Sequence, residues 1–107
     1  MKLIFAIVNN DDSSVVASSL TAAGFSATKL ATSGGFLKAG NTTFIVGTQD
    51  DKVEEVIGIV RDHSRKRTKI MPESSSQPKG SFPTKAVEVN VGGAIIFVVD
   101  VDQFEKC

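Results

Sequence analysis

Apolar and polar positions fall into blocks along the chain, and the first of these blocks predict three strands and one helix. Residues 3–8 have no polar interruption, as expected of a central strand covered on both faces. In residues 12–23 the apolar positions recur at helical spacing, and Gly24 stands where a glycine commonly ends a helix. Residues 25–32 and 41–48 are rich in Thr, Phe, Leu, Ile and Val, which predicts two further strands.

A second helix is predicted from Asp50 to about His63. Asp50 and Asp51 open it, and Asp51 with Glu54 has the spacing of a capping box. Arginines in and after its last turn suit the negative end of the helix dipole. Its core-facing positions follow the i, i+3, i+4, i+7 pattern and are Val53, Val56, Ile57 and Val60.

The last third of the chain predicts strands around a long loop. Residues 68–71 favour a short strand, and residues 72–83, with three prolines and a serine run, favour a surface loop. Residues 87–91 alternate apolar and polar side chains, as in a half-buried strand. Gly92 and Gly93 then read as a hairpin turn, and residues 94–99, which lack polar side chains, read as a central strand.

This order of elements predicts one ferredoxin-like domain over residues 1–107, βαββαβ with an extra hairpin strand. In such a fold both helices cover one face of an antiparallel sheet and leave the other face bare. The apolar strands 3–8 and 94–99 suggest that this bare face is covered. A second copy of the chain is the simplest cover, so we expect a homo-oligomer.

Net charge and cysteine content limit the kinds of partner and the cellular compartment that we expect for this protein. The 107 residues have a formal net charge of zero, which gives no global field for a nucleic acid polymer or an anionic membrane. The apolar N-terminal run is too short for a membrane span or a secretory signal. The single cysteine, Cys107, has no intrachain disulfide partner. We therefore expect a soluble, cytoplasmic protein.

Catalytic and metal-binding patterns are weak. The one histidine, His63, falls at the basic end of the second helix, and Cys107 is the last residue, so neither Ser-His-Asp nor metal-ligand spacing is present. The basic run from Arg61 to Lys69 fits either a solvated helix end or contacts with phosphates. We expect no enzyme activity, no metal and no cofactor.

The segment from Thr28 to Gly47 carries more specific chemistry. Phe36 and Leu37 stand at the tip of a glycine-containing loop, where polar residues are usual. Gly35 lets backbone N–H groups approach an anion, and Asn41 can both donate to and accept from the edge of an adenine. Phe36 can stack on a base. A turn whose Phe36 packs on a neighbouring subunit explains the same residues equally well.

Three parts of the chain resemble one family. They are residues 1–8, residues 27–44, and the group Val91-Gly92-Gly93-Ala94, Phe97 and Asp102-Gln103-Phe104. They are similar to the PII-like cyclic di-AMP receptor proteins of Gram-positive bacteria. The resemblance implies a ferredoxin-like homotrimer without catalytic activity. It also implies that cyclic di-AMP binds in each intersubunit cleft, orders the loops and relays the signal to a downstream protein.

The resemblance also assigns site residues. The positions that hold one adenine are Thr28, Asn41 and Gly47. The loop that encloses the ligand contains Gly35, Phe36 and Leu37. The glycine hairpin and strand near the same cleft contribute Gly92, Gly93 and Phe97.

Two departures from the family leave alternatives open. Ser26 stands where the family usually has a basic residue that meets a phosphate, and Lys29 or Lys38 are the candidates to replace that charge. The family's loop is rich in glycines and aromatics, whereas the loop 72–83 is shorter and has only Gly80 and Phe82 of these residue types. One alternative is therefore a PII-like regulator of a different nucleotide or small ligand. Two others of similar fold are a trimeric metal-tolerance protein and a small acyl-phosphate hydrolase.

Overall fold

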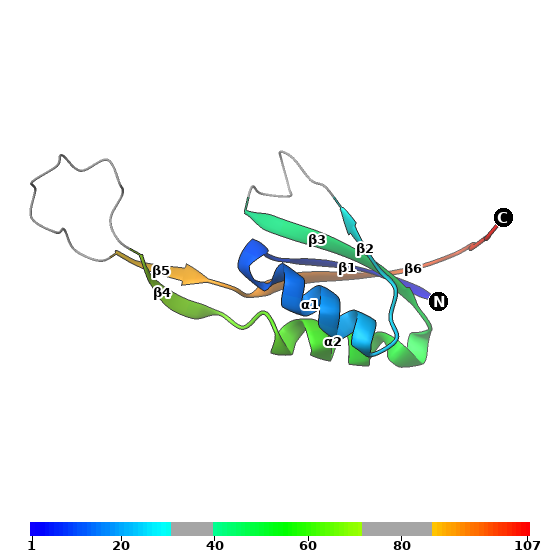
Figure 1. The fold of residues 1–107 in the computed structure, drawn as a ribbon. Helices are drawn as coiled ribbons and strands as arrows, with labels where there is room; N and C mark the ends of the chain where they lie inside the picture. Colours follow the sequence, from blue (N-terminus) through cyan, green and yellow to red (C-terminus); the bar gives the residue numbers. More distant parts are fainter. Residues whose placement is uncertain (31–39, 72–86) are drawn as a thin grey trace, which may run out of the picture.

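The computed structural model describes residues 1–30, 40–71 and 87–107. These described residues form two α-helices, one 3₁₀ turn and six strands (Figure 1). In chain order they are β1 (Lys2–Asn9), α1 (Asn10–Ala22), β2 (Ala27–Leu30), β3 (Asn41–Thr48), η1 (Asp50–Lys52), α2 (Val53–Asp62), β4 (Arg67–Met71), β5 (Val87–Val91) and β6 (Ala94–Asp100).

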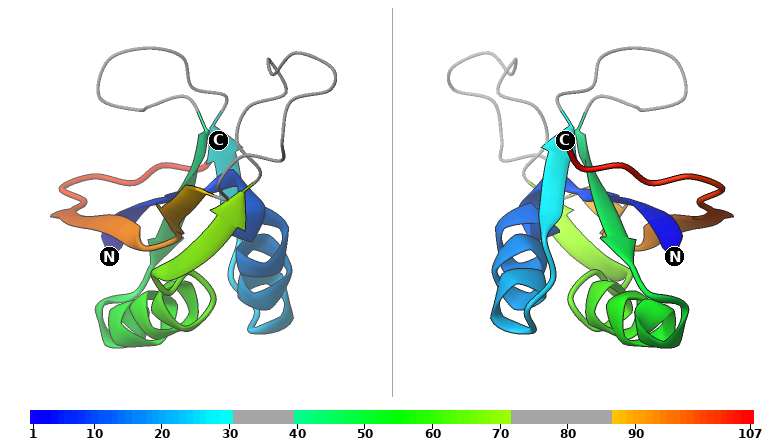
Figure 2. Two further views of the ribbon diagram at one scale, coloured as in Figure 1. Left: turned by 90° about the vertical axis from the view of Figure 1, so that its left-hand side faces the viewer. Right: turned by 90° about the vertical axis from the view of Figure 1, so that its right-hand side faces the viewer.

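The body is a four-stranded antiparallel sheet in the order β2-β3-β1-β6. Both helices lie on the same face of this sheet, as the end-on views show (Figure 2). A mixed domain of this order and sidedness is consistent with the predicted ferredoxin-like fold. In the part of the chain that the structure describes, no helix is long and apolar enough to cross a membrane.

The core lies between the helices and the sheet. On the sheet side it is built from alternate residues of the two central strands, such as Ile4 and Val46, both of which are fully buried. On the helix side it is built from the predicted stripes, whose buried members include Leu20 and Val60. Because strand side chains alternate between faces, the other half of each central strand points away from the helices.

Both helices begin differently from the prediction. α1 starts at Asn10, two residues early, because the Asn9 side chain accepts a 2.8 Å hydrogen bond from the Asp11 N–H and so acts as the N-cap. The capping box of Asp51 and Glu54 does not form: α2 has no side-chain cap, and a 3₁₀ turn over Asp50–Lys52 precedes it. The Asp50 carboxylate instead pairs with the N-terminal amino group at 2.9 Å. The predicted ends of α1 at Gly24 and of α2 at His63 agree with the structure.

The predicted hairpin across Gly92 and Gly93 is wrong. β5 pairs with β4 in a separate two-stranded ribbon, whereas β6 leaves the ribbon and pairs with β1. The ribbon projects from the body beyond α1 and α2 (Figure 1). The two glycines have φ of +89° and +83°, a conformation that redirects the chain from one sheet to the other.

β6 was expected at the centre of the sheet and lies at its edge. Its apolar run has a different origin: Ile96 packs against the core, while Ile95, Phe97 and Val99 point to the face that carries no helix. These three side chains are 56%, 42% and 43% exposed, which is high for large apolar groups. The described part of the chain therefore leaves an apolar sheet face uncovered.

We predict that Gly92→Ala destabilises the fold and that Gly58→Ala does not. A Cβ at Gly92 would collide with the Arg65 carbonyl oxygen, and its left-handed backbone costs a non-glycine residue about 1–2 kcal/mol even before that collision. A Cβ at Gly58, inside α2, meets nothing within 4 Å and should stabilise the helix by about 0.5–1 kcal/mol. Urea unfolding of the two variants measures both effects, and equal stabilities would contradict this account of the junction.

Candidate ligand-binding face

Four of the predicted ligand-binding residues lie on the uncovered face of the sheet. The cross-strand register places Phe97, Phe5, Ile45 and Thr28 in one row across all four strands. Phe5 points away from the helices because its neighbours Ile4 and Ala6 are in the core, so the whole row does the same. On β3, Asn41 and Gly47 share this face with Ile45, since they are separated from it by even numbers of residues.

One hollow, of about 320 Å³, brings three of the predicted residues together at one end of this face. Asn41 at the start of β3 lines it with Gly92 and Gly93, although these segments are far apart in the sequence. Its floor is apolar, from Ile7 and Ile95. An amide beside an apolar surface and positive-φ glycines offers directional hydrogen bonding and close backbone approach together.

A second hollow, of about 410 Å³, lies at the opposite end of β3. Ser26 and Gly47 line it, together with residues from the C-terminal end of α1 and the N-terminal end of α2. The cation on its edge, Lys52, lies 3.9 Å from the Glu55 carboxylate. Thr28, one strand from Ile45 and exposed, stands on the same half of the sheet.

A single protomer does not bring the predicted adenine contacts into one place. Asn41 and Gly47 are six residue steps apart along β3, which is about 20 Å. Thr28 and Phe97 lie on opposite edge strands of the four-stranded sheet, about 14 Å apart. One base cannot span these distances within a single copy of the chain.

Of the three candidate phosphate contacts, Ser26, Lys29 and Lys38, the two that the structure describes do not lie in one place. Ser26 is in the second hollow, as described above. Lys29 pairs with the core residue Phe44 in the register, so its side chain leaves the sheet on the helix side, opposite to Thr28. Lys38 lies outside the described residues, as do the three residues of the predicted enclosing loop: Gly35, Phe36 and Leu37.

Two residues that the sequence did not single out as site residues, Asn9 and Lys66, also line the first hollow. Asn9 is opposite Asn41 in the β1–β3 register, and Lys66 precedes the ribbon. Alternation within β1 could have suggested Asn9, since it continues the face that carries Ile7. Lys66 belongs to the basic run from Arg61 to Lys69, for which contacts with phosphates were one of two interpretations. Its place in this hollow had no local signal, because it depends on how the segment before β4 crosses Gly93.

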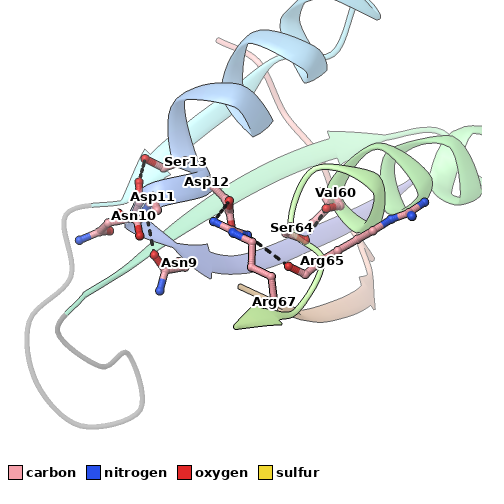
Figure 3. Close-up of polar contacts among 9 residues, drawn as sticks. All are labelled: Asn9, Asn10, Asp11, Asp12, Ser13, Val60, Ser64, Arg65 and Arg67. Carbon is pink, nitrogen blue, oxygen red and sulfur yellow. Dashed lines mark hydrogen bonds and ion pairs between the residues drawn. The ribbon is translucent and has the colours of Figure 1, made fainter. Parts of the chain in front are cut away.

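A polar cluster at the N-terminus of α1 ties three elements together, and Figure 3 shows its contact between α1 and Arg67. The Asn10 N–H donates to the Gly40 carbonyl oxygen at 2.9 Å, and the Thr42 hydroxyl donates to Asn10 Oδ1 at 2.6 Å. Arg67, the first residue of β4, donates to both carboxylate oxygens of Asp12, at 2.8 and 3.3 Å. These bonds hold the pKa of the Arg67 guanidinium above its ordinary value. The start of β3 and the base of the ribbon are therefore attached to the same helix end.

The Thr43 hydroxyl is a further polar feature of the uncovered face. Thr43 is only 2% exposed, and its hydroxyl oxygen has no hydrogen-bond partner among the described residues. Thr43 lies beside Ile7 and Leu30 in the sheet register. A buried hydroxyl without a partner is unfavourable, so this position favours a further group from outside the described chain.

The described residues contain no cluster of side chains suited to binding a metal ion. Among those residues no three His, Cys, Asp or Glu side chains lie close enough to hold a metal ion. His63 is the C-cap residue of α2 and is exposed, and Cys107 is exposed near the end of an extended tail.

We predict that Arg67→Met loosens the ribbon from the body, whereas Arg65→Met does not. Losing Arg67 leaves the nearly buried Asp12 carboxylate without its partner, while Arg65 reaches Asp62 at 3.6 Å with both side chains largely exposed. Hydrogen exchange of the β4 and β5 amides should accelerate in Arg67→Met and stay close to wild type in Arg65→Met. Unchanged exchange in both variants would show that the ion pair does not anchor the ribbon.

The chain is similar in fold to a solved structure and in sequence to one protein family. A crystal structure described as that of a functionally unknown protein from Pediococcus pentosaceus ATCC 25745 is similar, with a TM-score of 0.75 and 38% sequence identity. The match covers 99% of this chain and 96% of that chain. The model of a protein family described as cyclic-di-AMP receptor matches residues 1–107. Since this match covers the whole chain, the protein belongs to the cyclic-di-AMP receptor family.

Proposed function

We propose that this protein is a PII-like signalling protein that binds cyclic di-AMP in clefts between the subunits of a homotrimer. The observation that carries the proposal is the division of the recognition residues between two ends of an uncovered apolar face. Asn41, Gly92 and Gly93 lie at one end, and Gly47 with Thr28 at the other. Membership of a receptor family supports cyclic di-AMP as the ligand.

A trimer makes these two ends complementary. If the uncovered face of one subunit packs against its neighbours, the Asn41 end of one subunit can face the Gly47 end of the next. The apolar side chains between them, such as Phe97 and Ile95, then lose contact with water, at about 25 cal/mol for each Å² buried. Closed rings of identical interfaces satisfy every copy of the face equally.

The ligand then changes what a downstream protein meets. Phe36 can stack on a base, and by the family resemblance Gly35, Phe36 and Leu37 enclose the ligand. The segment that contains them ends at Gly40, whose carbonyl is bound to the N-terminus of α1. Arg67 binds the same helix end, so a shift at Gly40 is transmitted to the ribbon through hydrogen bonds. Couplings between sites are commonly about 1–3 kcal/mol.

A second candidate is a PII-like regulator of a different nucleotide. Ser26 supports it, because a serine in the Gly47 hollow supplies no charge for a phosphate, and Lys52 on the same edge is paired with Glu55. The two candidates share the same fold and site and differ in the ligand alone. A panel of nucleotides separates them.

We expect a solution mass of three times the 11.3 kDa chain, and loss of that assembly in Val99→Lys. Val99 is 43% exposed on the uncovered face, and a lysine there would place a charge in the proposed interface. Val15→Lys is the matched control, because Val15 is 48% exposed on the outer side of α1. Multi-angle light scattering gives the masses. A monomeric wild type, or a trimeric Val99→Lys as stable as Val15→Lys, would contradict the interface.

We expect calorimetry to show binding of cyclic di-AMP in preference to cyclic di-GMP, AMP and ATP. Asn41→Ala should weaken binding by about 5- to 150-fold, because lost hydrogen bonds to a buried base cost about 1–3 kcal/mol. Asn90→Ala, the same change at an exposed ribbon position outside the first hollow, should bind as wild type. Binding of another member of the panel alone would favour the second candidate, and no heat with any of them would refute both.

A further inference from the structure

The charge balance of the first hollow is unusual for a net-neutral protein. Lys66 is the one ionisable side chain among the described residues that line it, beside the polar Asn9 and Asn41. No carboxylate of the described chain forms an ion pair with Lys66. The hollow that holds Asn41 is therefore bordered by a lysine that no carboxylate of the described residues pairs with.

Among the other cations of the described chain, four are in ion pairs, Arg61 lies on α2 and Lys106 lies after β6, both outside this hollow. Lys2 and Lys52 pair with Asp100 and Glu55, and Arg65 and Arg67 pair with Asp62 and Asp12. Lys29 leaves the sheet on the helix side. Lys66, which has no ion-pair partner among the described residues, lines the same hollow as the predicted base-recognition residue Asn41.

The backbone of Lys66 is held firmly on both sides. Arg65, before it, presents its carbonyl oxygen to Gly92 so closely that no Cβ would fit there. Arg67, after it, is bound to Asp12 through two hydrogen bonds. The buried Ser64 accepts a hydrogen bond from the Gly93 N–H, which fixes the glycine pair against the same segment.

The stem of Lys66 is positioned by the absence of a side chain at Gly93. Its Cγ and Cε lie 3.1 and 3.3 Å from the place that a Cβ of Gly93 would occupy. The stem therefore lies across the glycine backbone, and a larger residue at position 93 would displace it. A charged group on a packed stem loses less conformational freedom on binding than one on a free stem.

From this geometry we infer that Lys66 is the residue that neutralises a phosphate of the bound dinucleotide, in the role that the basic residue missing at Ser26 would have had. This inference rests on the proposed function. A cyclic dinucleotide carries two phosphodiesters, each with one negative charge, and a lysine donates charge-assisted hydrogen bonds to such oxygens. With its base at Asn41, the ligand places a phosphate beside the hollow that Lys66 borders.

Calorimetric titration of cyclic di-AMP into wild type, Lys66→Met, Lys66→Arg and Lys29→Met tests the inference. Methionine keeps an apolar stem over Gly93 and removes the charge. We expect Lys66→Met to lose about tenfold or more in affinity, Lys66→Arg to stay within about threefold of wild type, and Lys29→Met to be unchanged. The affinity of wild type should also fall more steeply with added salt than that of Lys66→Met.

The outcomes distinguish a failure of the proposed function from a failure of the role inferred for Lys66. If wild type does not bind cyclic di-AMP, the proposed function fails. If wild type binds cyclic di-AMP and Lys66→Met binds it with the same affinity as wild type, at both low and high salt, the proposed function stands and the role of Lys66 is wrong. Light scattering and thermal unfolding of each variant show whether a weaker titration reflects lost assembly or folding. A Lys66→Met that is trimeric, as stable as wild type and weaker in binding supports the inference.

Discussion

The one-sided covering of the sheet is the constraint on which the rest of this protein depends. Both helices pack on one face of β2-β3-β1-β6, where Ile4, Val46, Leu20 and Val60 form a closed core. A strand must place its alternate residues on the opposite face, and here those residues are mostly apolar. The described chain is therefore well packed on one side, while on the other Ile95 and Phe97 remain largely exposed. The proposed assembly between copies would resolve that imbalance.

The same one-sidedness explains why the recognition chemistry is divided. The predicted site residues of β3, Asn41 and Gly47, stand at the two ends of one strand, and a strand cannot bend back to bring its ends together. A site shared between neighbouring subunits needs no such bend. Oligomerisation and ligand binding are then two consequences of one face, and a change in the interface should disturb the ligand as well.

The glycine pair at positions 92 and 93 links this face to the ribbon. Its positive φ angles turn the chain from β5 into β6, and the missing side chains admit the Arg65 carbonyl and the Lys66 stem. The turn thus decides three things at once: the start of the edge strand, the wall of the Asn41 hollow and the position of a cation. The polar cluster of Asn10, Asp12 and Arg67 fixes the neighbouring base of the ribbon to α1.

Local patterning determined much of this protein by itself. The stripe of Val53, Val56 and Val60 and the uninterrupted run of β1 specify helix and strand through short-range periodicity, which any chain segment carries within itself. The family resemblance, too, depends on motifs readable along the chain. Tertiary structure alone decided which strands pair. Gly92 and Gly93 suit a hairpin as well as a junction between two sheets, and the choice depends on whether β6 gains more by pairing with β5 or with β1. For the same reason the approach of Lys66 to Asn41 could not be foreseen: it arises from a crossing of segments distant in the sequence, and no local periodicity records such a crossing.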